Sequence, residues 1–227
     1  MCRRYLSDVL SLIFLSIRTH RMPLTRSQRA NLQAPPPRSQ GVTVRFPKSF
    51  KVHDQGNEDT CTLHAVTAVH EIITGSRLVT NDLNTGKLVE RGGSTVAELS
   101  RILRSKGQRE QGGKASHRIS FKRLADDISA VKKALIKGVP VVLGTNNFIF
   151  EDSNEYNLTL SNSDHACAGK HSVVIVGFCD ADDYEGGGLF RVLNSHGRSW
   201  GDNGFGTVSY GHFLANNIEV HVPVTSA

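Results

Sequence analysis

Residues 194–206 read NSHGRSWGDNGFG, and this stretch says more about the fold than any other part of the chain. Asn194 ends the apolar segment 189–194 (LFRVLN), and glycines recur closely behind it. Glycine adopts positive φ without a steric penalty, so the chain can leave a strand here through tight turns. We therefore expect Asn194 to stand at the end of a strand, with its side-chain amide held at the start of a glycine-rich loop.

Residues 170–178, KHSVVIVGF, place a histidine at the head of an apolar segment. Its β-branched residues predict a buried strand, and His171 is then well placed at the edge of a crevice. A histidine that acts as a general base needs its ring held in one tautomer. An asparagine carbonyl that accepts a hydrogen bond from the imidazole N–H does this. We therefore pair His171 with Asn194.

Residues 54–61, DQGNEDTC, end on a cysteine at the start of a predicted helix. Backbone N–H groups and the helix dipole favour a thiolate at such a position. The amide of Gln55, in the preceding turn, can point back at the same place, and a thiolate beside an amide donor is the minimum for acyl transfer. Each residue alone also fits a structural role: Cys61 as a buried apolar residue, His171 as a cap, Asn194 as a turn residue. Together they fit one mechanism.

Helical patterns precede strand patterns along the chain. Capping residues and apolar spacing predict helices at 60–74, 95–107 and 127–138. Apolar runs between Gly- and Asp-rich turns predict strands at 140–144, 171–178, 189–194 and 206–210. A helical half followed by a strand half predicts an α+β fold, with the crevice between the halves as the place for a site.

The formal charge of +6 comes from the first forty residues. They hold seven basic residues and one acidic residue, which leaves 20 basic against 20 acidic residues in the rest. A neutral body does not support nucleic-acid binding. We expect residues 1–41 to be a disordered basic leader with a Pro-rich linker, and residues 42–227 to be one domain. The apolar stretch 6–17 is too short for stable membrane insertion. It could be a targeting helix, a weak secretion signal or an extension with no role in the fold.

The three segments resemble the active-site segments of papain-family cysteine peptidases, in the short, prokaryote-like form. DQG-x4-C resembles the cysteine segment, HSVVIVGF the histidine strand and residues 194–206 the asparagine loop, which usually reads NSWG-x2-WG-x2-G. The resemblance implies a papain-like two-lobed fold, with a helical N-terminal lobe, an antiparallel β C-terminal lobe and the site in the cleft between them. It also implies an endopeptidase that hydrolyses protein or peptide substrates through a covalent acyl-enzyme and uses no cofactor.

The same resemblance assigns roles to six residues. They are Cys61 as nucleophile, His171 as base and later acid, Asn194 as the residue that orients His171, Gln55 as oxyanion donor, and Gly92 and Gly93 as a glycine pair that binds the substrate backbone.

Four nearby residues depart from the family pattern. Asp59 adds a negative charge near the thiolate, which should raise its pKa, and Lys170 should lower the pKa of the neighbouring His171 imidazolium. Thr62 stands where the family usually has tryptophan. His196 replaces a tryptophan that shields the histidine–asparagine hydrogen bond from water. We therefore expect a wetter, looser pair and modest turnover.

Alternatives remain at this point. The chain could be a papain-fold binding module that has lost catalysis, or a related deamidase or transglutaminase-like acyl transferase. Cys167 and Cys179 could form a disulfide if their strands met, and the cysteine spacing does not settle the cellular compartment. A metal site could be built from His165, Cys167, His171 and Cys179, although no structural zinc pattern has that spacing. The acidic stretch 180–185 could bind calcium, but it reads better as a solvated turn.

Overall fold

The computed structural model describes residues 41–84, 93–146, 170–182 and 184–224. The chain divides into two units, Met1–Ala34 and Pro35–Ala227, and every described residue belongs to the second unit. Apart from residue 41, the predicted leader and linker therefore lie outside the described residues. In the part that is described, no helix has both the length and the hydropathy needed to cross a bilayer.

Helix α2, Cys61–Thr74, forms because apolar residues recur on one of its faces, and Val66 and Val69 are fully buried there. Thr60 occupies the N-cap position as predicted, but its hydroxyl makes no capping bond. The helix ends at Gly75, whose left-handed φ of 76° lets its N–H donate to Glu71 O at 2.9 Å. The predicted bounds of this helix are confirmed.

Two further helices begin at the predicted caps. Helix α4, Val96–Ser105, starts with a full capping box in which Thr95 and Glu98 satisfy each other's backbone N–H groups. Helix α5, Ile128–Ile136, begins where the Asp127 carboxylate accepts from the N–H of Ala130 at 2.7 Å. A short 3-10 helix, η1, spans Thr80–Leu83.

One antiparallel sheet of seven strands forms the centre of the unit, in the order β4-β9-β5-β6-β7-β8, with β1 beside β6. Its strands are β1 Val42–Thr43, β4 Ser120–Arg123, β5 Val141–Thr145, β6 His171–Asp180, β7 Gly188–Leu193, β8 Phe205–Ser209 and β9 Asn217–Val224. A separate hairpin pairs β2, Gln108–Arg109, with β3, Ser116–His117, and a last helix, α6, spans Tyr210–Asn216. The predicted α+β class with an antiparallel sheet is confirmed.

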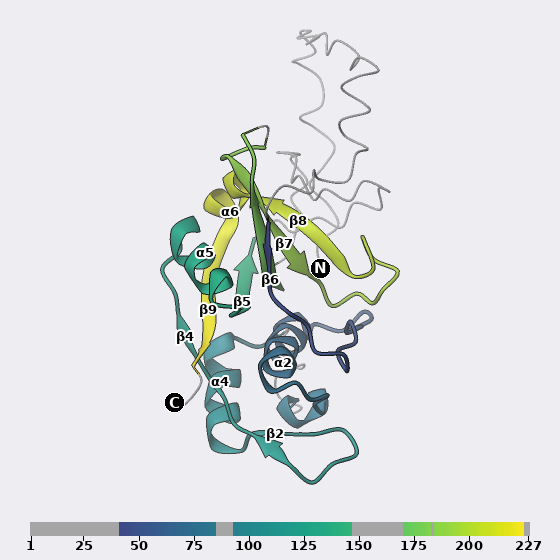
Figure 1. The fold of residues 1–227 in the computed structure, drawn as a ribbon. Coiled ribbons are helices and arrows are strands. Elements are labelled where there is room, and N and C mark those ends of the chain that lie inside the picture. Colours follow the sequence, from purple (N-terminus) through teal and green to yellow (C-terminus); the bar gives the residue numbers. More distant parts are fainter. Residues whose placement is uncertain (1–40, 85–92, 147–169, 183, 225–227) are drawn as a thin grey trace, which may run out of the picture. The chain divides into compact units, whose positions relative to one another are not determined.

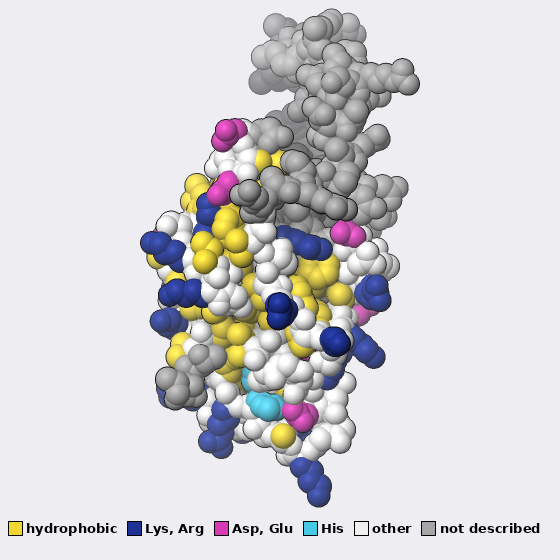
Figure 2. Space-filling view, in the orientation of Figure 1, with side chains coloured by type: hydrophobic (Ala, Val, Ile, Leu, Met, Phe, Trp, Pro, Cys, Tyr) yellow, Lys and Arg dark blue, Asp and Glu magenta, His cyan; other side chains and the backbone are white. Residues whose placement is uncertain are grey.

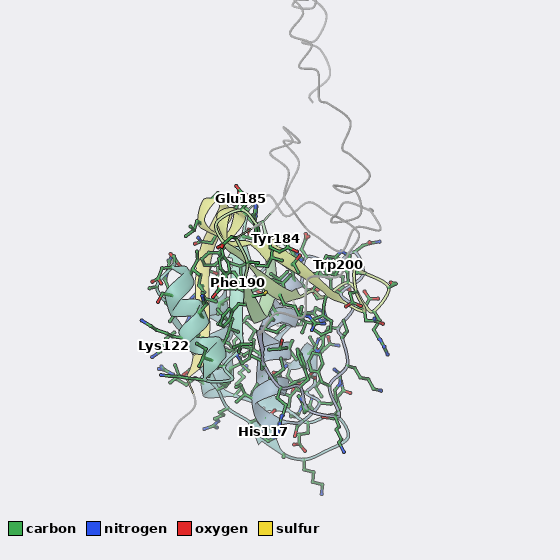
Figure 3. All side chains as sticks on the ribbon, turned by 45° about the horizontal axis from the view of Figure 1, so that its top comes forward. His117, Lys122, Tyr184, Glu185, Phe190 and Trp200 are labelled. Atoms are coloured by element: carbon green, nitrogen blue, oxygen red, sulfur yellow. The ribbon has the colours of Figure 1, made fainter. Side chains whose placement is uncertain are left out.

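The sheet is buried on both faces, and side chains alternate between two cores along its strands. On β6, Val173 and Ile175 lie in one core and Val174 and Val176 in the other. The first core includes residues of α5 and α6 with Phe190 of β7, and the second includes residues of α2 and α4. Figure 1 shows α2 and α4 below β5 and β6, and α6 at the upper end of the strands. Figure 3 shows Phe190 inside the unit.

Helices and strands are more interleaved along the chain than the predicted order of helices followed by strands. Strand β1 comes first in the chain yet pairs with β6, and β4 precedes α5 yet pairs with β9. Helix α5 packs into the same core as β5 and β7, on the strand side of the molecule. Gly177 permits the first of these pairings, because a Cβ there would stand 2.6 Å from Val42 O.

The described surface carries mixed charge. Figure 2 shows Lys and Arg side chains spread over several parts of the visible face, with Asp and Glu side chains among them. The dispersed pattern agrees with the balance of basic and acidic residues that the sequence gives this part of the chain.

A buried histidine of α6 predicts acid sensitivity of the fold. His212 is 5% exposed, and burial lowers its pKa from 6.5 to about 4. Between these values the unfolded chain binds a proton that the folded chain does not, so stability is lost as pH falls from about 6.5 toward about 4. The shift sets an upper limit of about 3 kcal/mol on the loss in the free energy of unfolding, because solvent screening reduces the effect.

The prediction is measured as urea unfolding at several pH values across this window. Because carboxylates also titrate there, His212→Gln is the matched comparison. We expect the variant to lose less stability than the parent chain between pH 7 and 4. Equal losses in the two proteins would show that His212 does not contribute.

Candidate active site

The loop that leads into α2 and the loop that follows β7 lie side by side. The N–H of Gln55 donates to Ser195 O at 2.7 Å, and the N–H of Gly197 donates to His53 O at 2.9 Å. Gly197 has a φ of +73°, and a Cβ at this position would stand 2.8 Å from a carboxylate oxygen of Asp54. A glycine is therefore required at this point of the 194–206 segment for the two loops to pair.

His171 and Asn194 are joined by a hydrogen bond of 2.8 Å between Nε2 and Oδ1. The backbone N–H of Ser195 donates to the same Asn194 oxygen at 2.8 Å, which identifies this atom as the carbonyl oxygen. His171 Nε2 must then be the donor, so the neutral ring carries its proton on Nε2. The other nitrogen, Nδ1, keeps its lone pair and is the atom that can accept a proton.

This pair is buried, with His171 7% and Asn194 2% exposed. The expected wetter pair is therefore wrong for the described residues. Burial is the largest cause that lowers the pKa of His171, and the hydrogen bond to Asn194 opposes it. Lys170, which we expected to lower this pKa, is exposed and is not among its causes.

Cys61 is the first residue of α2, where the backbone N–H groups of the first turn have no partner within the helix. Its thiol is partly buried and is not in a disulfide. The next residue, Thr62, lies with its hydroxyl 2.9 Å from that of Ser172, and both side chains are buried. Since Ser172 follows His171 directly, this bond joins the start of α2 to the start of β6. It brings together the two segments that carry Cys61 and His171.

The Gln55 side chain lies between the two loops with a fixed orientation. Its Oε1 accepts from the hydroxyl of Ser195 at 2.6 Å, and its Nε2 donates to Glu58 O at 2.6 Å. The amide nitrogen therefore faces the turn 58–61 that precedes Cys61. An NH2 group has two hydrogens, so one remains after the bond to Glu58.

The glycine pair predicted to line the cleft is only half described. Gly92 lies outside the described residues. Gly93 has a φ of +117°, and a Cβ there would stand 3.5 Å from Asp59 O. Gly93 therefore lies against the turn that leads into Cys61, in a conformation that favours glycine.

A buried polar cluster behind the site was not foreseen from the sequence. Glu71 of α2 is 1% exposed, and its Oε2 is 2.9 Å from His53 Nε2 and 3.0 Å from Arg77 Nη1. His53 Nδ1 lies 3.1 Å from His64 Nδ1. A buried carboxylate needs such partners, so a glutamate on the apolar face of a helix was the signal that could have revealed the cluster.

The metal alternatives find little support. His171 and Cys179 stand eight residues apart on β6, which is about 26 Å along a strand, so one ion cannot bind both. His165 and Cys167 lie outside the described residues, so the alternative of a Cys167–Cys179 disulfide also falls partly outside them. The calcium alternative concerned the acidic stretch 180–185. There the Asp180 carboxylate already has protein partners, because it accepts hydrogen bonds from Lys132 and from the hydroxyl of Tyr210.

The fold is shared with solved cysteine proteases. Xylellain, a cysteine protease from Xylella fastidiosa, superimposes with a TM-score of 0.68 at 20% identity, over 88% of this chain and 90% of that one. The bromelain protease of Ananas comosus, solved with the inhibitor E64, gives 0.61 at 18% identity over 82% and 99%. The CMS1MS2 protease of Carica candamarcensis, solved with E-64, gives 0.60 at 16% identity over 78% and 94%. At these identities the likeness concerns the fold alone.

The sequence adds family membership. A search of curated protein sequences finds no match to the chain. The sequence model of the papain family of cysteine proteases, in contrast, matches residues 88–224, a stretch that includes His171 and Asn194 and begins after Cys61. This match covers more than half of the 227 residues. The chain therefore belongs to the papain family of cysteine proteases.

Proposed function

We propose that the chain is a thiol-dependent endopeptidase that hydrolyses peptide bonds through Cys61, His171 and Asn194. The observation that carries the proposal is the fixed tautomer of His171. Its Nε2–H is bound to Asn194, so Nδ1 is the nitrogen that can take a proton from a thiol. The start of α2 is joined to the start of β6 by the Thr62–Ser172 bond, which places Cys61 and His171 in adjoining segments.

The proposed reaction begins with proton transfer from the Cys61 thiol to His171 Nδ1. The thiolate attacks the carbonyl carbon of the peptide, and the carbonyl π electrons move to oxygen. The oxyanion then re-forms the carbonyl and the C–N bond breaks as His171 gives its proton to the leaving amine, so that a thioester to Cys61 remains. Water attacks this thioester with His171 again as the base, which releases the acid and restores the thiol.

The oxyanion formed in each step needs donors that are already in place. The Cys61 backbone N–H lies in the first turn of α2, where no partner within the helix is available. The second donor is the remaining N–H of Gln55 Nε2, whose amide is held by Ser195 on one side and by Glu58 O on the other. Fixed donors of this kind lose little free energy to reorganisation when the charge develops.

A peptide-library digest of the purified full chain under reducing conditions tests this function. We expect cleavage of internal peptide bonds that is abolished by a thiol-alkylating reagent, and the pattern of cut sites would also give the side-chain preference. Binding of peptides without cleavage would instead favour the catalytically inactive binding module. Release of ammonia from glutamine side chains without chain cleavage would favour a deamidase.

A further inference from the structure

A second imidazole lies against the proposed catalytic one. The rings of His171 and His196 are 5.6 Å apart between centroids and inclined by 22°, so they lie nearly parallel. The backbone of His196 is fixed by its antiparallel bridge with Asp54. His196 therefore covers His171, as the tryptophan of the family pattern would, but with a ring that can take a proton.

Three ionisable groups interact electrostatically with His196, each from a different segment. His171 of β6 lies in the stack, and a positive charge there disfavours a charge on His196. Asp54, in the loop before α2, favours the charged form. The third group is His64, on α2. A positive charge on His64 opposes a positive charge on His196, and the reverse also holds. Burial is the largest influence on His196 and lowers its pKa, as it does for His171.

The two rings differ in their surroundings. His171 is buried, with 7% of its surface exposed, whereas His196 is only partly buried and has the carboxylate of Asp54 as a neighbour that favours its charged form. When pH falls, we therefore expect His196 to take a proton more readily than His171 in the absence of a thiolate. Two charged imidazoles in one stack repel each other, so the pair titrates as a unit.

We propose that His196 is a positioning residue that acts through His171: its protonation opposes the imidazolium form of His171 and so turns off the site on acidification. The inference rests on the proposed function, in which His171 must hold a proton to deliver it to the leaving amine. Protonation of His196 leaves the geometry of the stack intact. It removes the imidazolium form of His171, which is the form that delivers a proton to the leaving amine. The peptidase is then active near neutral pH and inactive in acidic surroundings.

The first test follows hydrolysis as a function of pH in the full chain and in His196→Phe. Phenylalanine keeps a flat ring over His171 but cannot be protonated. We expect the acid limb of kcat/KM to move to lower pH by about one unit in the variant, and to become less steep because one titrating group is removed. His117→Gln is the control. His117 lies in the β2–β3 hairpin, at the end of the described unit away from the loop that holds Trp200 (Figure 3), and should leave the limb unchanged.

The second test does not depend on catalysis. NMR titration of the His171 ring is compared in Cys61→Ala and in Cys61→Ala with His196→Phe, and we expect the midpoint of His171 to rise by about one pH unit when His196 is removed. An unchanged midpoint together with an unchanged acid limb would overturn the inference while leaving the peptidase function in place. A raised midpoint in a chain that hydrolyses no peptide would overturn the function but keep the coupling of the two rings.

Discussion

Cys61→Ala should abolish hydrolysis of unfolded proteins, with a loss of about 10⁴-fold or more in kcat. The expected loss is this large because the remaining groups have no nucleophile to activate, and only the oxyanion donors and substrate binding are left. Cys61 is the first residue of α2, and alanine is a good helix former, so the fold should be retained. The measurement is the rate of casein digestion, with circular dichroism to check the fold.

Cys179→Ala is the matched control for this change. Cys179 is also partly buried, but it lies near the far end of β6, eight residues along the strand from His171. Its substitution should leave the rate within about twofold, as is usual for changes away from a site. Hydrolysis that survives in Cys61→Ala and is lost in Cys179→Ala would place the nucleophile elsewhere.

Gln55→Ala should lower kcat by about 10²- to 10³-fold, which is the usual cost of removing one oxyanion donor. The effect should fall on kcat more than on KM, because the oxyanion exists in the transition state and not in the bound substrate. Steady-state kinetics on a single peptide substrate separates these two parameters.

Two further variants distinguish the role of Gln55 as an oxyanion donor from a role in holding the two loops together. Ser195→Ala removes the hydroxyl that holds Gln55 Oε1 but keeps the Gln55 amide, so its loss should be smaller than that of Gln55→Ala. Asn57→Ala changes an exposed side chain in the same loop and should have little effect. Losses of equal size in Ser195→Ala and Gln55→Ala would mean that Gln55 acts only by holding the loops together.

Local signals predicted much of the fold. The capping box of Thr95 and Glu98, the Asp127 cap and Gly75 all act where the sequence places them, because caps depend on a few neighbouring residues. The strands β1, β4 and β9 were missed. β1 and β4 are only two and four residues long, and their pairing partners are remote in the sequence. β9, NIEVHVPV, does alternate polar and apolar residues, which is a strand signal, but Pro223 within the run weakens it.

The site was predicted in the same uneven way. The pairing of His171 with Asn194 could be inferred because their chemistry requires each other, although 23 residues separate them. The stack of His196 on His171 could not, since the sequence indicates only that a shielding tryptophan is replaced. The Thr62–Ser172 bond spans 110 residues, and nothing in either hydroxyl indicates its partner. Contacts of this kind follow from the register of α2 on the sheet, which only the folded structure provides.

The most direct test of the central claim relates modification of Cys61 to loss of activity. The full chain is treated with an epoxysuccinyl reagent, the fraction of each cysteine that is modified is measured by peptide mass mapping, and the remaining hydrolysis is measured in the same samples. We predict that activity falls in proportion to modification of Cys61 and reaches zero when Cys61 is fully modified, while Cys167 and Cys179 react far more slowly. Equal reaction of the three cysteines in the folded protein, or full modification of Cys61 with activity retained, would contradict the assignment of Cys61 as the nucleophile.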